Sequence, residues 1–93
     1  MRTYKVETEQ GEFTVEEMKE KPTVDLEHKK GYTRFYQVRA VNGLIVFWLG
    51  RGHYEAPTEV VGWYRKSKKM HYGYGKTFKE AVELLIRDGW KYA

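Results

Sequence analysis

Basic and aromatic side chains are interleaved between Trp63 and Tyr74, and this stretch offers the clearest chemistry in the sequence. Four of five consecutive positions at its centre are basic, namely Arg65, Lys66, Lys68 and Lys69. Basic side chains neutralise phosphates and release counterions, and aromatic faces stack on nucleobases. A two-stranded ribbon is also narrow enough to enter a major groove. The stretch therefore predicts nucleic-acid contact at the tip of a hairpin.

The candidate nucleic-acid-binding residues extend beyond this tip. Arg51 and Lys76 are expected to contact further phosphates, while Trp63, Tyr72 and Tyr74 would stack on bases or brace the ribbon. The complete set is Arg51, Trp63, Arg65, Lys66, Lys68, Lys69, His71, Tyr72, Tyr74 and Lys76. Two ordinary explanations stay open, because hairpin tips are commonly charged for solubility and tyrosines on strands commonly fill the faces of a sheet.

The segment Gly73-Tyr-Gly-Lys-Thr77 is similar to the end of a phosphate-binding loop. The complete motif needs a glycine where Met70 stands, and the chain is too short for a nucleotide-hydrolysing domain. We therefore expect no nucleotide hydrolysis. The free N–H groups at a helix start near Thr77, with Lys76 beside them, would still suit a backbone phosphate.

A glycine-bearing loop, Gly50–Glu55, contains His53 and Glu55. With His28 and His71 elsewhere in the chain, a hydrolytic site or a metal site is conceivable. No pair of these residues has the spacing of known metal ligands, so we expect no catalysis, no metal and no other cofactor. An enzymatic hypothesis would require His53 and Glu55 to converge in one pocket.

Composition narrows the protein class. The 93 residues carry a formal net charge of +4, which divides into −4 over residues 1–27 and +8 over residues 28–93. This asymmetry suits a nucleic-acid or electrostatic partner surface, whereas the acidic third is either simply solvated or a negative patch for a basic partner. Cysteine is absent, which excludes a disulfide framework, a thiolate zinc site and a cysteine nucleophile.

Length and hydropathy predict one cytoplasmic domain over residues 1–93. A chain of this size holds a single core. Its longest apolar run, Leu44–Leu49, is far shorter than the roughly 20 residues of a membrane-spanning helix. The N-terminus has no apolar segment of the kind found in signal peptides.

The elements that would position these residues are mainly strands. Alternating or β-branched segments predict strands at 2–7, 23–28, 32–41, 44–49, 59–66 and 70–74. Asn42-Gly43 predicts a two-residue type I′ hairpin turn, and Gly50–Thr58 is expected to be a loop.

Two capping-box motifs predict helices. Thr14-Val-Glu-Glu17 favours a short helix at 15–20, with a hairpin through Phe13 and Val15 as the alternative. Thr77-Phe-Lys-Glu80 predicts a helix at 77–88 with Thr77 as its N-cap. An apolar stripe follows at helical spacing, and Gly89 is expected to end the helix as its C′ residue.

These elements predict an α+β domain. Its antiparallel sheet would have four to five strands joined by consecutive hairpins, with one face packed by the C-terminal helix. With Phe35, Trp48 and Trp63 on strands before one amphipathic helix, residues 32–87 resemble the three-stranded DNA-binding sheets of integrase arm-type and plant AP2-like domains. The resemblance assigns no residue roles.

The sequence thus favours a small non-enzymatic nucleic-acid-binding domain. The alternative is a protein-interaction module or inhibitor, such as a phage or mobile-element accessory protein that docks on a nucleic-acid enzyme. Its bipolar charge and its surplus of aromatic residues support that alternative. The protein would be a monomer or a homodimer paired through edge strands.

Overall fold

The computed structural model describes residues 3–24, 26, 29–56 and 58–93. Within them, six strands precede one α-helix and a short 3₁₀ helix. The elements are β1 (Thr3–Thr8), β2 (Gly11–Met18), β3 (Arg34–Ala40), β4 (Ile45–Arg51), β5 (Val60–Tyr64), β6 (Met70–Gly73), α1 (Phe78–Gly89) and η1 (Trp90–Tyr92). The expected α+β class, antiparallel sheet and C-terminal helix are confirmed, with six strands where four to five were expected.

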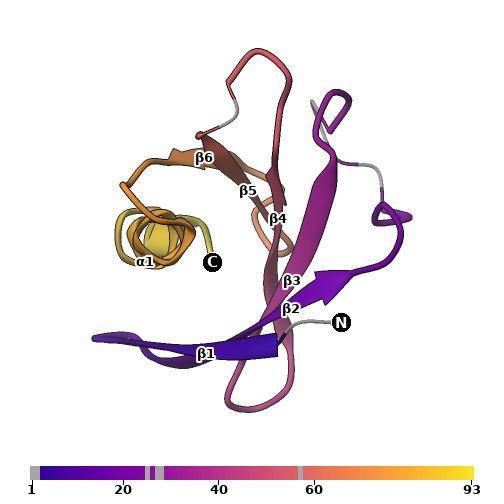
Figure 1. The fold of residues 1–93 in the computed structure, drawn as a ribbon. Coiled ribbons are helices and arrows are strands. Elements are labelled where there is room, and N and C mark those ends of the chain that lie inside the picture. The colour runs from indigo at the N-terminus through magenta and orange to yellow at the C-terminus, as the bar shows by residue number, and fades with distance from the viewer. Residues whose placement is uncertain (1–2, 25, 27–28, 57) are drawn as a thin grey trace.

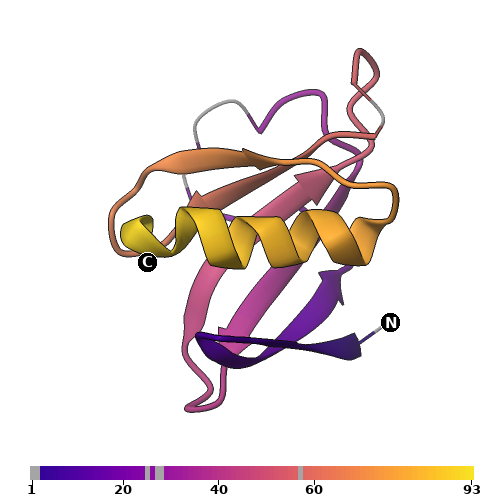
Figure 2. The ribbon, with the colours of Figure 1, turned by 90° about the vertical axis from the view of Figure 1, so that its left-hand side faces the viewer.

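The sheet is a simple meander that curls around the helix. Each strand pairs antiparallel with the next, in the order β1-β2-β3-β4-β5-β6. In Figure 1, α1 lies in the hollow of the curled sheet, and Figure 2 shows it running across the open side. It contacts both edge strands, β1 and β6, and also β5. The helix therefore fills the gap that the curled sheet leaves between its edges.

The main core lies between α1 and the concave face of the sheet. The apolar stripe of the helix packs there against inward-pointing residues of the strands. The buried residues of this main core are Val6, Phe13, Val15, Tyr36, Val38, Phe47, Leu49, Val60, Tyr64, Ala81, Val82, Leu85 and Ile86. Burial of this continuous apolar surface is the dominant favourable term that holds the helix in place.

Thr77 caps the start of α1 as expected, whereas the glycine at its end is there for another reason than the one expected. The Glu80 N–H donates to Thr77 Oγ1 at 3.2 Å, and the Lys76 N–H donates to Glu80 Oε2 at 3.0 Å. Gly89 is the last helical residue and has φ of −91°, so it is not the left-handed C′ residue that was expected. A Cβ at Gly89 would overlap the Tyr64 hydroxyl, so close packing explains this glycine.

The helix expected at 15–20 is wrong, because residues 11–18 form β2. Phe13 and Val15 alternate into the core, as the hairpin alternative required. β2 is hydrogen-bonded on both sides, to β1 and to β3. Two ladders and two buried side chains outweigh a four-residue capping motif with no apolar stripe behind it.

The strand expected at 23–28 is not formed at Thr23 and Val24, which lie in a bend, and positions 25, 27 and 28 fall outside the described residues. The convex face of the sheet is covered in another way. A second core cluster there consists of Tyr32, Phe35, Val61 and Trp63, with Met18, Leu26, Trp48 and Met70 packed against it.

The β3–β4 hairpin forms at Asn42-Gly43, but its turn type differs from the expectation. The Ala40 N–H donates to the Leu44 carbonyl at 3.0 Å, and the Gly43 N–H donates to the Ala40 carbonyl at 2.9 Å. Within this turn, Gly43 has a positive φ, of 85°, and Asn42 does not. The loop therefore has three residues and one left-handed glycine, rather than the two left-handed residues of a type I′ turn.

Gly50 and Arg51 were expected in a loop and instead extend β4, opposite Phe35 and Arg34. A Cβ on Gly50 would lie 2.9 Å from the Trp63 ring, so this glycine leaves room for Trp63 on the convex face. No helix in the described part of the chain has both the length and the apolar character needed to cross a membrane.

Candidate nucleic-acid interface

The basic tip, defined as residues Arg65–Lys69, is the turn between β5 and β6. The Tyr64 N–H donates to the Lys69 carbonyl at 2.9 Å, and the Lys68 N–H donates to the Tyr64 carbonyl at 3.0 Å. Lys68 adopts φ of 62°, the left-handed conformation that closes the turn. All four basic side chains of the tip are exposed, and among the described residues none lies within ion-pair distance of a carboxylate. The tip is therefore an uncompensated cluster of positive charge on a fixed turn.

An apolar groove of about 440 Å³ lies directly beside the basic tip. It is lined by Ala40, Asn42, Leu44, Ile45, Val46, Arg65, Lys66, Trp90 and Ala93. Arg65 borders it in a fixed position, because its Nε donates to the Ile45 carbonyl at 2.8 Å. Figure 2 shows the β5–β6 turn beside the C-terminus, which closes the other side of this region. Sequence reasoning missed the groove, since it joins three separate segments.

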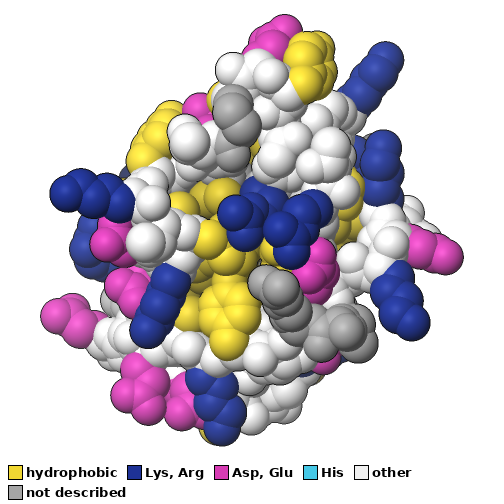
Figure 3. Space-filling model, viewed as in Figure 1, with side chains coloured by type: hydrophobic (Ala, Val, Ile, Leu, Met, Phe, Trp, Pro, Cys, Tyr) yellow, Lys and Arg dark blue, Asp and Glu magenta, His cyan; other side chains and the backbone are white. Residues whose placement is uncertain are grey.

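Arg51 and Lys76 line one pocket, and this pocket lies away from the basic tip. Both line a small pocket of about 140 Å³ at the start of α1, together with Thr77. The Arg51 guanidinium lies 4.1 Å from the centre of the Phe78 ring. In the view of Figure 3, Lys and Arg side chains lie over an apolar area in the middle of the molecule. The length of β5 separates this pair from the basic tip by about 13 Å.

The aromatic candidates divide into buried and exposed groups. Trp63 is 3% exposed and packs against Tyr32 and Phe35, so it braces the sheet and offers no free face for stacking. His71 is half-buried and its ring lies 6.0 Å from that of Tyr92, on the helix side. Tyr72 and Tyr74 are exposed and keep ring surface available for a ligand.

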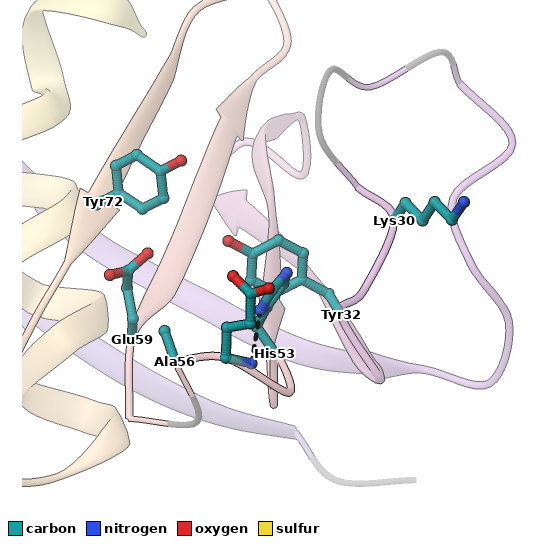
Figure 4. A pocket seen from close by; sticks show the side chains of 7 residues that line it. Lys30, Tyr32, His53, Ala56, Glu59 and Tyr72 are labelled. Carbon is teal, nitrogen blue, oxygen red and sulfur yellow. Dashed lines mark hydrogen bonds between the residues drawn. The ribbon is translucent and has the colours of Figure 1, made fainter.

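His53 and Glu55 line one pocket, which we call the tyrosine pocket (Figure 4). Its volume is about 380 Å³ and its lining is Lys30, Tyr32, His53, Glu55, Ala56, Glu59 and Tyr72. The Glu55 backbone N–H donates to His53 Nδ1 at 3.1 Å. A backbone group therefore orients the imidazole, and the lining offers no Ser, Thr or Cys as a nucleophile.

The oxygen atoms of the tyrosine pocket influence one another. Burial, followed by the neighbouring Tyr72, Glu59 and Tyr74 side chains, raises the pKa of Tyr32 to about 12. Burial and the charge of Glu59 also raise the pKa of Tyr74. Within the described ranges, no three His, Asp or Glu side chains are grouped so that they could hold a metal ion. The pocket thus gathers acceptor oxygens without a set of metal ligands.

Comparisons with protein-family models, curated proteins and solved structures found no match to this chain. The resemblance to three-stranded DNA-binding sheets is therefore without support beyond the residues that suggested it.

Proposed function

We propose that the protein is a small, non-enzymatic nucleic-acid-binding domain that contacts phosphates through the basic tip. The observation that carries the proposal is the set of four exposed cations on one fixed turn, with no carboxylate partner among the described residues. Such charges gain most from phosphate contact, because binding releases the condensed counterions of the nucleic acid.

Tyr72 extends this surface along the convex face of the β5–β6 hairpin. It lies three residues from Lys69, which is about 10 Å along a strand. Its ring is exposed and on the face away from α1, so it can stack on a base of a strand held at the basic tip. Arg51 and Lys76 would take a second group of phosphates about four nucleotides away, at 3.4 Å per nucleotide.

The experiment is a fluorescence anisotropy titration with labelled single-stranded and duplex DNA and RNA at low and moderate salt. If the four basic tip residues each neutralise one phosphate, a fourfold rise in salt weakens duplex binding about 150-fold and single-strand binding about 50-fold. Absence of binding at low salt would overturn the proposal.

A charge-reversal variant assigns the binding to the basic tip. Lys66→Glu/Lys69→Glu should abolish most of the affinity and lower the salt slope by about 1 for each lysine lost. The matched control, Lys19→Glu/Lys21→Glu, makes the same change in net charge on exposed residues that follow β2. Equal losses in the two variants would mean that only net charge matters and that the basic tip is not the contact.

A protein partner is the second candidate function, and the apolar groove favours it. Leu44 and Trp90 line this groove and are 58% and 39% exposed, and Val41, between the lining residues Ala40 and Asn42, is 79% exposed. Exposed apolar groups gathered next to cations suit a partner surface that is apolar and acidic. Stoichiometric co-purification of a partner that is lost with Leu44→Asn and kept with Lys66→Glu/Lys69→Glu would establish this function in place of the first.

A further inference from the structure

The tyrosine pocket carries chemistry that the basic tip does not use. It lies between the loop after β4, the segment before β3 and the convex face of β6 (Figure 4). Its lining combines two carboxylates with three ring-bearing side chains. The two carboxylates would repel an anion such as a phosphate. A ligand of this pocket should therefore differ in charge from the phosphates proposed for the basic tip.

Glu55 and Glu59 supply the negative charge of the pocket. Among the described residues, no Lys, Arg or His nitrogen lies within ion-pair distance of Glu55 or Glu59. Lys30 is the basic residue of the lining, and in Figure 4 its ammonium points away from Glu59 and Tyr72. The pocket therefore presents negative charge that the protein itself leaves unneutralised.

Aromatic rings form the other component of the pocket. The His53 ring packs edge-on to Tyr32 at 4.8 Å and stacks on Tyr54 at 4.6 Å. Tyr72 faces the pocket from β6, on the side where Figure 4 places Glu59. Tyrosine faces attract cations through the ring quadrupole.

The acceptor groups of the pocket also lie close enough to influence one another. The ionisation of Tyr32 is opposed by burial and then by Tyr72, Glu59 and Tyr74. The phenol hydroxyls are neutral and can donate to the carboxylates, but they leave further acceptor lone pairs and the negative charge unmatched. A ligand with several N–H donors and a positive charge would satisfy both the hydrogen bonds and the charge.

We propose that the tyrosine pocket binds an organic cation, an ammonium or guanidinium group on an aliphatic carrier. The carboxylates of Glu55 and Glu59 would accept its hydrogen bonds, and the rings of Tyr72 and His53 would contact the carrier and the charge. The volume of about 380 Å³ exceeds what an ammonium group alone needs and leaves room for several carbon atoms. A bare metal ion is disfavoured, because the described residues supply no group of three ligands. The site shares Tyr72 with the proposed nucleic-acid surface, but Glu55, Glu59 and His53 take no part in that function.

The cation has two chemical sources, a free amine or a basic side chain of a polypeptide. The test titrates ¹⁵N-labelled protein with 1,4-diaminobutane in one arm, and with N-acetyl-arginine amide and N-acetyl-lysine amide in the other. We expect saturable shifts of the backbone N–H signals of residues 52–56 and of Tyr72. Binding in the first arm alone assigns a free amine, binding in the second alone assigns a basic side chain, and binding in both assigns the cationic group whatever its carrier.

Variants locate the binding within the pocket. Glu55→Gln/Glu59→Gln keeps the side-chain shape and removes both charges, and it should weaken binding about fivefold or more. The control Glu9→Gln/Glu83→Gln removes the same charge from the β1–β2 turn and from α1, and it should leave the affinity unchanged. A second variant, Tyr72→Leu, should weaken binding through loss of the ring face while both carboxylates remain.

The neutral analogue N-acetyl-norleucine amide completes the design, because it keeps the carrier and lacks the charge. It should produce no saturable shifts. The proposal is overturned if no cation gives saturable shifts at the pocket, if the neutral analogue binds equally well, or if Glu55→Gln/Glu59→Gln binds as the wild type does while its other signals show an intact fold.

Discussion

Gly89 lies so close to the Tyr64 hydroxyl that no larger side chain fits at this position. This hydroxyl donates to the Leu85 carbonyl at 2.6 Å and is buried, so it cannot easily move aside. Replacing a helical glycine with alanine ordinarily adds about 0.5–1 kcal/mol of stability. Here the added methyl group would overlap Tyr64, and overpacking of a core costs about 1–3 kcal/mol. We expect Gly89→Ala to lower the free energy of unfolding measured by urea denaturation.

The same contact predicts a coupling between the two residues. In a Tyr64→Phe background the hydroxyl is gone, although the ring carbon Cζ still lies 2.6 Å from the position of the new Cβ. The penalty of Gly89→Ala should therefore be smaller in that background, with a coupling of about 0.5 kcal/mol or more in a double-mutant cycle. Equal penalties in the two backgrounds would show that another contact excludes the side chain.

Tyr32 predicts a loss of stability at alkaline pH. Burial and its neighbours raise the pKa of this phenol to about 12, from about 10 in an unfolded chain. Below pH 10 the phenol is neutral in both states, so its contribution to stability is complete. Between pH 10 and 12 only the unfolded state releases the proton, so stability falls with rising pH by up to about 1.4 kcal/mol per pH unit.

The measurement is urea denaturation at several pH values for the wild type and for Tyr32→Phe. The variant lacks the titrating group, so its curve should fall less steeply between pH 10 and 12. Parallel curves would show that Tyr32 ionises equally well in the folded and the unfolded protein.

Residue roles were only partly predictable from the sequence. The sequence identifies Trp63 and Tyr72 equally well as aromatic residues of one hairpin. The fold separates them, because Tyr32, Phe35 and Gly50 enclose Trp63 while Tyr72 lies on the less covered edge strand. Such enclosure depends on segments that are remote in sequence, and no local pattern records it.

The same Thr-x-x-Glu capping motif occurs in two elements that adopt different structures. Thr77 caps α1, and an apolar stripe follows it. Thr14 lies within β2, opposite Lys5 on one side and Arg39 on the other. The motif alone is therefore not decisive, because a short helix is only marginally stable unless an apolar face packs behind it. For the same reason the C-terminal helix was predictable and the strand at 11–18 was not.

A matched pair of variants distinguishes the two motifs. Threonine and valine have nearly the same shape, so Thr→Val removes the hydroxyl and little else. Thr77→Val should lower the free energy of unfolding by about 1 kcal/mol, because the Glu80 N–H loses its acceptor. Thr14→Val should change it by less than about 0.5 kcal/mol, since valine is equally suited to a strand. Urea denaturation of both variants measures these changes in the free energy of unfolding. A large loss for Thr14→Val with none for Thr77→Val would contradict the capping role given to Thr77.

At the scale of the whole molecule, the β3–β4 and β5–β6 hairpins were predictable and the relations between hairpins were not. The basic tip follows from a local turn between two strands, and it forms where the sequence predicts it. The separation of Arg51 and Lys76 from the basic tip follows from the length of β5 and the curl of the sheet around α1. The tyrosine pocket likewise joins Tyr32 to the segment 53–59 and to Tyr72, across three elements.

The molecule therefore carries two candidate sites of opposite charge, about 15–20 Å apart along the β5–β6 hairpin. Reversing two charges at the basic tip changes the potential at the tyrosine pocket by an amount that salt controls. At about 0.01 M salt the screening length is about 30 Å, and Coulomb's law gives roughly 0.5 kcal/mol for Lys66→Glu/Lys69→Glu. At about 0.15 M the screening length of about 8 Å leaves roughly 0.1 kcal/mol.

The coupling between the two sites is thus predicted to keep its sign and to shrink as the salt concentration rises. Lys66→Glu/Lys69→Glu should raise the affinity of the tyrosine pocket for the singly charged N-acetyl-arginine amide about twofold at low salt, and leave it unchanged near physiological salt. The same variant should lose nucleic-acid binding at both. Titrations at the two salt concentrations measure both effects on one protein. A large gain in cation affinity that persists at physiological salt would mean that the basic tip contacts the pocket directly, in the same chain or in a second copy.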